Sequence, residues 1–212
     1  MNYLFPNTVM QIFCKAPQPG SVKTRLMPQL TATQAAHVHR QLTQRTLKLV
    51  TSKPLCPVQL WCTPSTDHPF FRELADSFAL HLSAQSPGDL GQRMVAALNT
   101  GIGEFGSALL IGCDCPSLTQ KDLIEALSAL AENHDVVIAP TEDGGYSLIG
   151  LKQSQPEIFN GINWGTSEVY ADTGLRISAL NLQCRELNLQ WDVDTYSDYL
   201  RYLEVFDQAH VW

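Results

Sequence analysis

The loop KAPQPGSVKTRL, residues 15–26, contains the residue types best suited to binding phosphate. It follows an apolar run and combines two prolines and a glycine with the cations Lys15, Lys23 and Arg25. A loop rich in Gly and Pro can hold backbone N–H groups so that they converge on an anion. Lys23 and Arg25 stand two positions apart, so in an extended segment both could face a diphosphate. A solvated surface turn is the alternative, and the loop alone does not decide between the two.

Three aspartates directly follow strand-like runs, where carboxylates often bind metal. Asp114 comes after the aliphatic run ALLIG, and Pro116 prevents that strand from continuing. In WDVDT, Asp192 and Asp194 share one face of an extended segment and repel each other unless a cation or a proton lies between them. We therefore predict that Asp114, together with Asp192 or Asp194, binds Mg²⁺ or Mn²⁺ through hard oxygen atoms.

Helix capping is the alternative role for these aspartates. Ser117-x-x-Gln120 resembles a capping box, which would leave Asp114 free for another role. Asp194 or Thr195 can begin the last helix, and one aspartate of the pair can cap while the other binds metal. Cys113 and Cys115 flank Asp114, but no second Cys/His pair stands at zinc spacing, so a soft-metal site there is only weakly indicated.

The motif EDGGY, residues 142–146, suits contact with a second substrate. Its two glycines, Gly144 and Gly145, permit positive φ and a close approach of a ligand to the backbone. Asp143 can bond hydroxyl groups and Tyr146 can stack on a ring. A tight Asp-Gly turn between two strands is the alternative, and spacing alone favours the turn.

Two more motifs contain candidate contacts. Asp89 and Arg93 stand one helical turn apart in GDLGQRM, where they form either an ion pair or part of a nucleotide pocket. Trp164 and Thr166 in NWGT place an aromatic ring and a hydroxyl in a loop, where they can contact an acceptor.

Short apolar runs alternate with amphipathic runs between these motifs. This alternation predicts βα units around a mostly parallel sheet, with ligands beyond the carboxyl ends of the strands. We expect one α/β domain over residues 1–212, a three-layer α/β/α sandwich. The expected strands are residues 8–14, 58–62, 79–84, 108–111, 135–139, 146–151 and 185–189. The expected helices cover 33–50, 70–78, 89–98, the stretch after the proposed cap at 117, the second half of 153–181, and 196–206.

Composition limits the partners of this chain. The formal net charge of −7 argues against a non-specific grip on nucleic acid, which needs clustered Lys and Arg. No apolar run approaches the ~20 residues of a membrane span, and the start MNYLFPNTVM lacks the charged region of a secretory signal. We expect a cytoplasmic protein whose six cysteines are reduced and mostly buried.

Taken together, the motifs resemble those of bacterial glycosyltransferase-A-like transferases. The matching stretches are FCKAPQPGSVKTRL, GDLGQRM, LLIGCDCPSLT, APTEDGGYSLIGL, NWGT and DVDT, which span nearly the whole chain in family order. More distantly, the layout is similar to guanylyltransferases for molybdenum cofactor and for 2-phospholactate. One departure is clear: the D-x-D of metal-dependent glycosyltransferases is D-C-P here, which leaves one carboxylate at that strand end.

The resemblance implies a nucleotide-diphospho-sugar transferase fold of Rossmann-like, GT-A type. It implies that the first loop holds a nucleotide, that Asp114 binds metal with Asp192 or Asp194, and that the 143–146 motif borders the acceptor. The nucleotide-binding residues implied or proposed are Lys15, Ala16, Pro17, Gly20, Lys23, Arg25, Asp89 and Arg93. The acceptor contacts are Gly144, Gly145, Tyr146, Trp164 and Thr166.

We therefore expect a metal-dependent glycosyltransferase that moves a sugar from a nucleotide-diphospho-sugar to a small acceptor. Lys23 and Arg25 would stabilise the leaving group, and Glu142 or Asp143 would act as base for the acceptor hydroxyl. The rival reaction is nucleotidyl transfer, in which an NTP joins a phosphorylated small molecule and releases pyrophosphate. A non-catalytic nucleotide-binding module ranks last, and a homodimer is left open.

Overall fold

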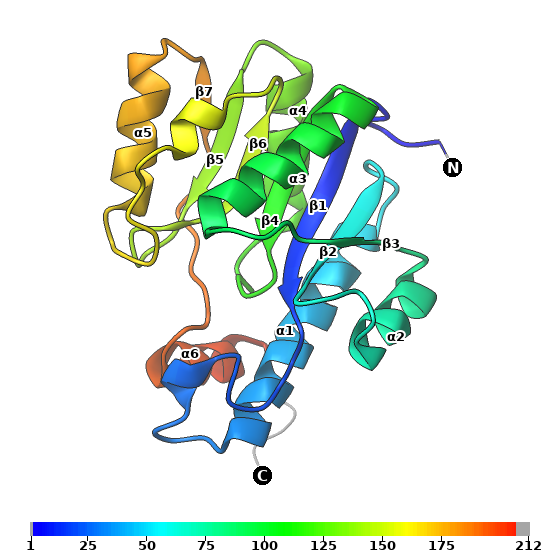
Figure 1. The fold of residues 1–212 in the computed structure, drawn as a ribbon, viewed down its shortest axis with the longest axis vertical. Helices are drawn as coiled ribbons and strands as arrows, with labels where there is room; N and C mark the ends of the chain where they lie inside the picture. The colour runs from blue at the N-terminus through cyan, green and yellow to red at the C-terminus, as the bar shows by residue number, and fades with distance from the viewer. Residues whose placement is uncertain (1, 207–212) are drawn as a thin grey trace.

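A computed structural model describes residues 2–206, so residue 1 and residues 207–212 of the expected domain lie outside the described residues. One sheet of seven strands forms its centre, in the order β3-β2-β1-β4-β6-β5-β7 (Figure 1). The strands are β1 (Thr8–Lys15), β2 (Val58–Thr63), β3 (His81–Ala84), β4 (Ser107–Gly112), β5 (Val136–Pro140), β6 (Tyr146–Leu151) and β7 (Cys184–Glu186).

The strand β6 runs against both of its neighbours, while the other six strands are parallel to one another. It follows β5 through a short turn, and Tyr146 pairs with Pro140 across the hairpin. Antiparallel neighbours can be joined by such a turn, whereas parallel ones need a long crossover. The start of β6 therefore lies at the edge of the sheet where β1 and β4 end.

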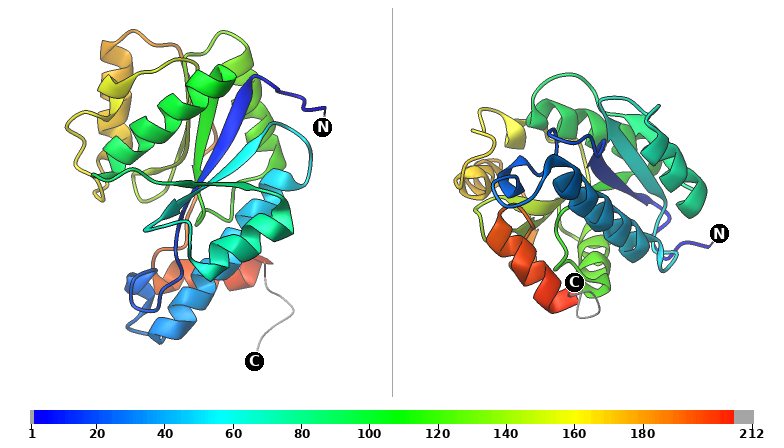
Figure 2. Two further views of the ribbon diagram at one scale, coloured as in Figure 1. Left: turned by 45° about the vertical axis from the view of Figure 1, so that its right-hand side comes forward. Right: turned by 90° about the horizontal axis from the view of Figure 1, so that it is seen from below.

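Helices cover both faces of the sheet, which confirms the expected three-layer arrangement (Figure 2). Side chains of β1 alternate between the two layers, with Met10 and Ile12 on one side and Val9 on the other. The helices of the first layer are α1 (Ala32–Thr51), α2 (Pro69–Phe78) and α4 (Gln120–Ala131). Those of the second are α3 (Leu90–Phe105), α5 (Val169–Ala179) and the 3₁₀ turn η2 (Pro156–Phe159).

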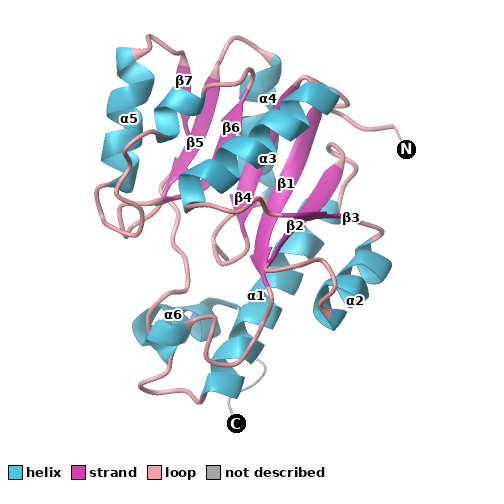
Figure 3. Ribbon diagram, viewed as in Figure 1, coloured by secondary structure: helices cyan, strands magenta, loops and turns pink. Residues whose placement is uncertain are grey.

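A smaller apolar cluster joins the last helix, α6 (Tyr196–Phe206), to the body of the protein. Tyr202 of α6 and Val193 pack there against Leu42 of α1 and Leu26 of the 3₁₀ turn η1 (Thr24–Leu26). Figure 3 shows α6 and the first loop next to each other below the sheet. This packing brings the WDVDT segment to the same edge of the sheet as the KAPQPGSVKTRL loop.

The local differences from expectation lie mostly at element ends. The capping box expected at Ser117 is wrong: Thr119 caps α4, together with Asp122. The strand expected over 79–84 begins only at His81, because Ala79 adopts a left-handed conformation that ends α2. The strand expected over 185–189 is displaced to Cys184–Glu186, where it pairs with β5.

All six cysteines are free thiols, and only Cys184 is exposed. None of the described helices combines the length and apolarity needed to cross a membrane.

Candidate functional site

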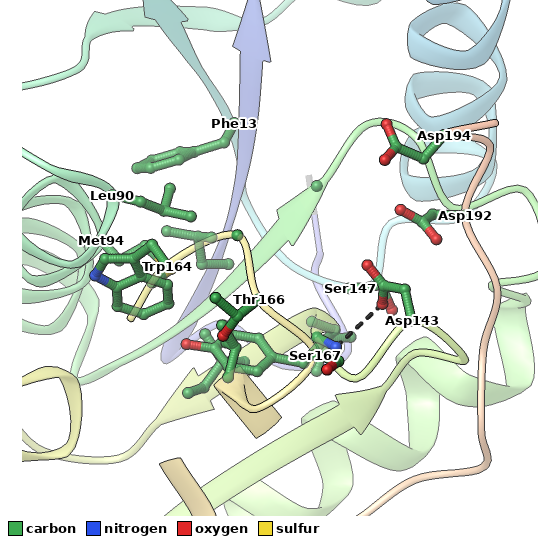
Figure 4. A pocket seen from close by; sticks show the side chains of 18 of the residues that line it. Phe13, Leu90, Met94, Asp143, Ser147, Trp164, Thr166, Ser167, Asp192 and Asp194 are labelled. Atoms are coloured by element: carbon green, nitrogen blue, oxygen red, sulfur yellow. Dashed lines mark hydrogen bonds between the residues drawn. The ribbon is translucent and has the colours of Figure 1, made fainter. Parts of the chain in front are cut away.

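A cleft in two parts opens where β1 and β4 end and β6 begins. The part of about 370 Å³ is lined by Lys15, Lys23, Arg25, Arg93 and Asp114, and we call it the cationic compartment. The part of about 570 Å³ is lined by Trp164, Tyr146, Met94, Asp143 and Asp192 among others, and we call it the aromatic compartment (Figure 4). The two share Phe13, Arg25, Leu90, Gly112 and Asp194, so a ligand can extend from one into the other.

The KAPQPGSVKTRL loop is folded tightly at the end of β1. Lys15 donates from Nζ to the carbonyl of Ser21 at 2.7 Å, which links the two ends of the loop. Ala16 and Val22 are buried and anchor it, and Gly20 takes a positive φ of 80°. The loop is therefore a shaped element of the cleft wall, although Ala16, Pro17 and Gly20 themselves do not line the cleft.

The expectation that Lys23 and Arg25 share a face of an extended segment is wrong. Lys23 has a left-handed backbone with φ of 48°, and the 3₁₀ turn η1 follows directly. A left-handed residue with a side chain costs free energy and persists where its surroundings require it. Both side chains nevertheless line the cleft, one buried and the other largely exposed.

Each of these two cations is paired with a predicted metal ligand. Lys23 Nζ lies 2.9 Å from Asp114 Oδ2, with 7% of the lysine side chain and 40% of the aspartate side chain exposed. Burial opposes charge on both groups, but their mutual attraction prevails, so the pKa of Lys23 is raised and that of Asp114 is lowered. Arg25 Nη1 contacts Asp194 in the same way at the shared boundary. Asp114 is thus kept ionised at neutral pH.

Asp192 stands out among the carboxylates of the cleft. Burial, followed by the charges of Asp114 and Asp143, raises the pKa of Asp192 to about 7. Carboxylates that raise one another's pKa are a suitable environment for a divalent cation, and oxygen ligands suit Mg²⁺ or Mn²⁺. By this test Asp114 and Asp192 fit the expected metal, although Asp114 is paired with Lys23 just as Asp194 is paired with Arg25.

Thr195, at the end of the WDVDT segment, caps the helix that follows it. Its hydroxyl accepts from the backbone N–H of Asp198 at 3.4 Å, and Asp198 Oδ2 accepts from the backbone N–H of Thr195 at 2.7 Å. This reciprocal pair caps α6, so neither Asp192 nor Asp194 is needed for it. The Val193 backbone N–H donates to the carbonyl of Asp114 at 3.0 Å, which holds the segment against the end of β4.

The EDGGY motif forms the turn between β5 and β6 and also lines the cleft. Asp143 Oδ1 accepts from the Thr141 hydroxyl at 2.6 Å and from the Gly145 backbone N–H at 3.0 Å, which holds the carboxyl group of this cavity-lining residue in place. Gly145 and Tyr146 line the aromatic compartment as well. The expected turn is confirmed, and contact of the motif with a second substrate stays a prediction.

Two residues of this motif lie apart from the cleft. Gly144 has φ of 87°, and a Cβ added to it would stand 2.0 Å from the carbonyl oxygen of Ser167. Glu142 is paired with Arg201 at 2.8 Å and lines neither compartment. Asp143 is consequently the better placed of the two candidate bases.

Asp89 and Arg93 have separate roles in the described structure. Asp89 accepts from the Gln92 backbone N–H at 2.9 Å and caps α3, and no ion pair joins it to Arg93 within residues 2–206. Arg93 donates to the carbonyl of Gly88 at 2.9 Å and lines the cationic compartment. Of the two, Arg93 alone reaches the cleft.

Trp164 and Thr166 both line the aromatic compartment, beside apolar residues of α3. A Cβ added to Gly91 of α3 would lie 2.9 Å from the Trp164 ring, so that glycine makes room for the indole. Leu90 of α3 is 41% exposed and opens into the cleft with Phe13, while Met94 is 3% exposed and also lines the cleft. Apolar residues of a cleft wall have the same spacing along a helix as those of a core face, so sequence periodicity does not distinguish the two.

A cluster of thiol and imidazole groups forms part of the wall of the cationic compartment. Cys14, His39 and Cys113 are buried, and their ligand atoms lie within 4.8 Å of one another, the only such trio among the described residues. Nε2 of His39 lies 2.8 Å from the carbonyl of Lys15. The weakly indicated soft-metal pair Cys113 and Cys115 is not what the fold assembles, because Cys115 points to Ser117 instead.

Comparison with known proteins points to one family and one fold. The model of a family described as "Uncharacterized protein conserved in bacteria (DUF2064)" matches residues 46–166, more than half of the chain. The crystal structure of a "putative nucleotide-diphospho-sugar transferase" from Desulfovibrio desulfuricans G20 is 28% identical, with a TM-score of 0.85 over 96% of this chain and 90% of that one. No curated protein matches the sequence.

More distant structures share the fold at low identity. A 4-diphosphocytidyl-2C-methyl-D-erythritol synthase from Anaerococcus prevotii DSM 20548 is 9% identical, with a TM-score of 0.64 over 98% of this chain and all of that one. CMP:2-keto-3-deoxy-manno-octonic acid synthetase, in complex with CTP, is 12% identical, with a TM-score of 0.58 over 96% of this chain and 99% of that one. The expected nucleotide-diphospho-sugar transferase fold is confirmed.

Proposed function

Since the chain belongs to the DUF2064 family and has the nucleotide-diphospho-sugar transferase fold, we propose that it transfers a sugar from a nucleotide-diphospho-sugar to a hydroxyl of a small acceptor. One observation carries the proposal: a single cleft at the carboxyl ends of β1 and β4 combines phosphate-binding cations with a set of carboxylates. The cations would bind the diphosphate of the donor. The carboxylates would bind the metal and accept the proton.

The cationic compartment suits the donor. Lys15 and Arg93 are oriented by backbone carbonyls, and Arg25 lies at the boundary, where the diphosphate would join the sugar. Lys23, held by Asp114, adds a buried positive charge near the same point. Charge that develops on the leaving diphosphate would be stabilised there by groups already in place, which is the most effective form of electrostatic catalysis.

Asp114 and Asp192 would hold the divalent cation. Their oxygen atoms and the raised pKa of Asp192 support this assignment. Mg²⁺ or Mn²⁺ bound there supplies further neutralisation of the leaving diphosphate. Lys23 and Arg25, which pair with the aspartates, would turn toward the donor phosphates on binding.

Asp143 would act as the base. Its Oδ1 is fixed by Thr141 and Gly145, so the carboxyl group keeps a defined orientation in the wall of the cavity. The acceptor oxygen would bond to the anomeric carbon while the bond from that carbon to the phosphate oxygen breaks. The hydroxyl proton passes to Asp143, and the nucleoside diphosphate leaves.

Product analysis with Asp114→Asn tests this function. Incubation with nucleotide sugars and Mg²⁺ or Mn²⁺ should release a nucleoside diphosphate, and Asp114→Asn should lower that rate by at least about 100-fold. Asp76→Asn, an exposed change on α2, is the control and should leave the rate unchanged. Melting curves of both variants show whether the fold is kept. Undiminished turnover in a folded Asp114→Asn protein would contradict the metal assignment.

Nucleotidyl transfer is the second candidate, because the 4-diphosphocytidyl-2C-methyl-D-erythritol synthase and the CMP-forming synthetase share this fold. The same assay separates the reactions, since a nucleotidyltransferase releases pyrophosphate from an NTP. Nucleotide binding without any product would instead favour a non-catalytic module.

A further inference from the structure

The aromatic compartment has two unlike sides, which bear on what it can hold. Figure 4 shows Phe13, Leu90, Met94 and Trp164 grouped on one side of the cavity, with Asp143, Asp192 and Asp194 on the other. A ligand in this space must present an apolar surface to the first side and tolerate three carboxyl groups on the second.

Positive charge is scarce in this compartment. Among the described residues that line it, Arg25 is the only cation, and its guanidinium already contacts Asp194. The cationic compartment, by contrast, has Lys15, Lys23 and Arg93 in addition to Arg25. Cationic side chains that could bind phosphate are therefore concentrated in the cationic compartment.

The apolar side is built to hold a flat group. The Trp164 ring lies over Gly91, where any larger residue would displace it, so the indole position is set by the backbone of α3. Aromatic rings bind flat apolar faces through stacking as well as burial. Leu90, although 41% exposed, continues this surface toward the boundary with the cationic compartment.

A neutral polar group completes the compartment. Ser147, at the start of β6, is 8% exposed and lines the compartment, and its hydroxyl interacts with the Cys115 thiol. It adds no charge to the compartment.

From these observations we infer that the acceptor is an uncharged hydroxyl compound with a flat apolar face, and that it carries no phosphate. This inference rests on the proposed function and narrows it. Even with a divalent cation on Asp192 and the donor diphosphate, a phosphate monoester in the aromatic compartment would meet Asp143 and Asp194 with no unpaired cationic side chain to offset them. Sugar transfer to a hydroxyl agrees with such an acceptor, whereas nucleotidyl transfer to a phosphate does not.

Paired ligands test the inference by binding alone. Aryl and nucleoside alcohols, each with its own phosphate monoester, are titrated into the full chain with Mg²⁺ by calorimetry. The unphosphorylated member of each pair should bind at least tenfold more tightly. Trp164→Ala should weaken binding of the alcohols by about tenfold, while nucleotide affinity stays the same.

Leu90→Lys provides the converse test, because it places a cation in the aromatic compartment at an exposed position, across from the carboxylates. It should improve the binding of each phosphate ester several-fold relative to the binding of its alcohol. Leu175→Lys, on α5 and 69% exposed outside the cleft, is the matched control and should change neither.

The outcomes separate this inference from the proposed function. If nucleotide sugars bind and turn over but the phosphate esters are the tighter ligands, the inference is wrong and the function stands. If no aryl or nucleoside alcohol binds, the inference is also overturned. If no nucleotide sugar binds or reacts, the proposed function fails, whatever the preference among acceptors.

Discussion

At the scale of single residues, the carboxyl group of Asp192 carries the clearest physical signature of function. Its pKa is raised to about 7 by burial and by Asp114 and Asp143. The folded chain therefore takes up a proton there that the unfolded chain, with a pKa near 4, releases more easily. A group of this kind weakens the fold as pH rises, and such costs are typical of functional sites.

Replacement of Asp192 by Asn should remove the loss of stability that ionisation of this carboxyl group causes as pH rises. Between about pH 4 and pH 7 the folded state binds more protons than the unfolded state, so the contribution of Asp192 to stability falls across that window. In EDTA, Asp192→Asn should therefore raise the melting temperature at pH 8 and change it little at pH 4. Asp76→Asn is the exposed control. An equal shift at both pH values would show that the carboxyl group is not perturbed.

At the scale of elements, the hairpin between β5 and β6 positions the candidate base and depends on one glycine. Gly144 combines φ of 87° with contact to the backbone of Ser167, and its carbonyl accepts from the Tyr170 backbone N–H at 2.8 Å. The turn is thus fastened to the loop that leads into α5. Movement of either part would shift Asp143.

Gly144→Ala should destabilise the protein by roughly 2–4 kcal/mol, because it adds a left-handed side chain and a clash with backbone. Gly103→Ala is the matched control, since it lies in α3 with nothing within 4 Å of an added Cβ. It should stabilise by about 0.5–1 kcal/mol, the usual gain for this change in a helix. Urea unfolding measures both. Equal effects of the two changes would contradict the proposed contact.

The sequence predicted elements well where periodicity is local, and less well where distant segments decide. The strand 146–151 follows from neighbouring residues, and it is confirmed. The choice of Thr119 over Ser117 does not, because Ser117 instead bonds Gln190, 73 positions away. The left-handed Lys23 and the pairing of Arg25 with Asp194 likewise depend on how α6 packs against the first loop. Many of the predicted site residues line the cleft, but their ion-pair and hydrogen-bond partners were not predicted.

At the scale of the whole molecule, the reactivity of the thiols measures how well the folded core excludes reagents from solvent. Five of the six cysteines are buried and none forms a disulfide. Iodoacetamide should therefore modify one cysteine of the native protein, Cys184, and all six after denaturation, as read from intact mass. Cys184→Ser should leave the native protein unmodified. Rapid modification of more than one thiol would show that the core opens readily.

The reversed strand β6 has a consequence for how such a protein can change over time. It brings the contiguous stretch 143–169 to the cleft as one wall, while the phosphate loop and Asp114 come from separate earlier segments. Substitutions or insertions in that stretch alter the aromatic compartment and leave the cationic one in place. If the proposed function holds, descendants of one ancestral chain can thus change their acceptor and keep their donor.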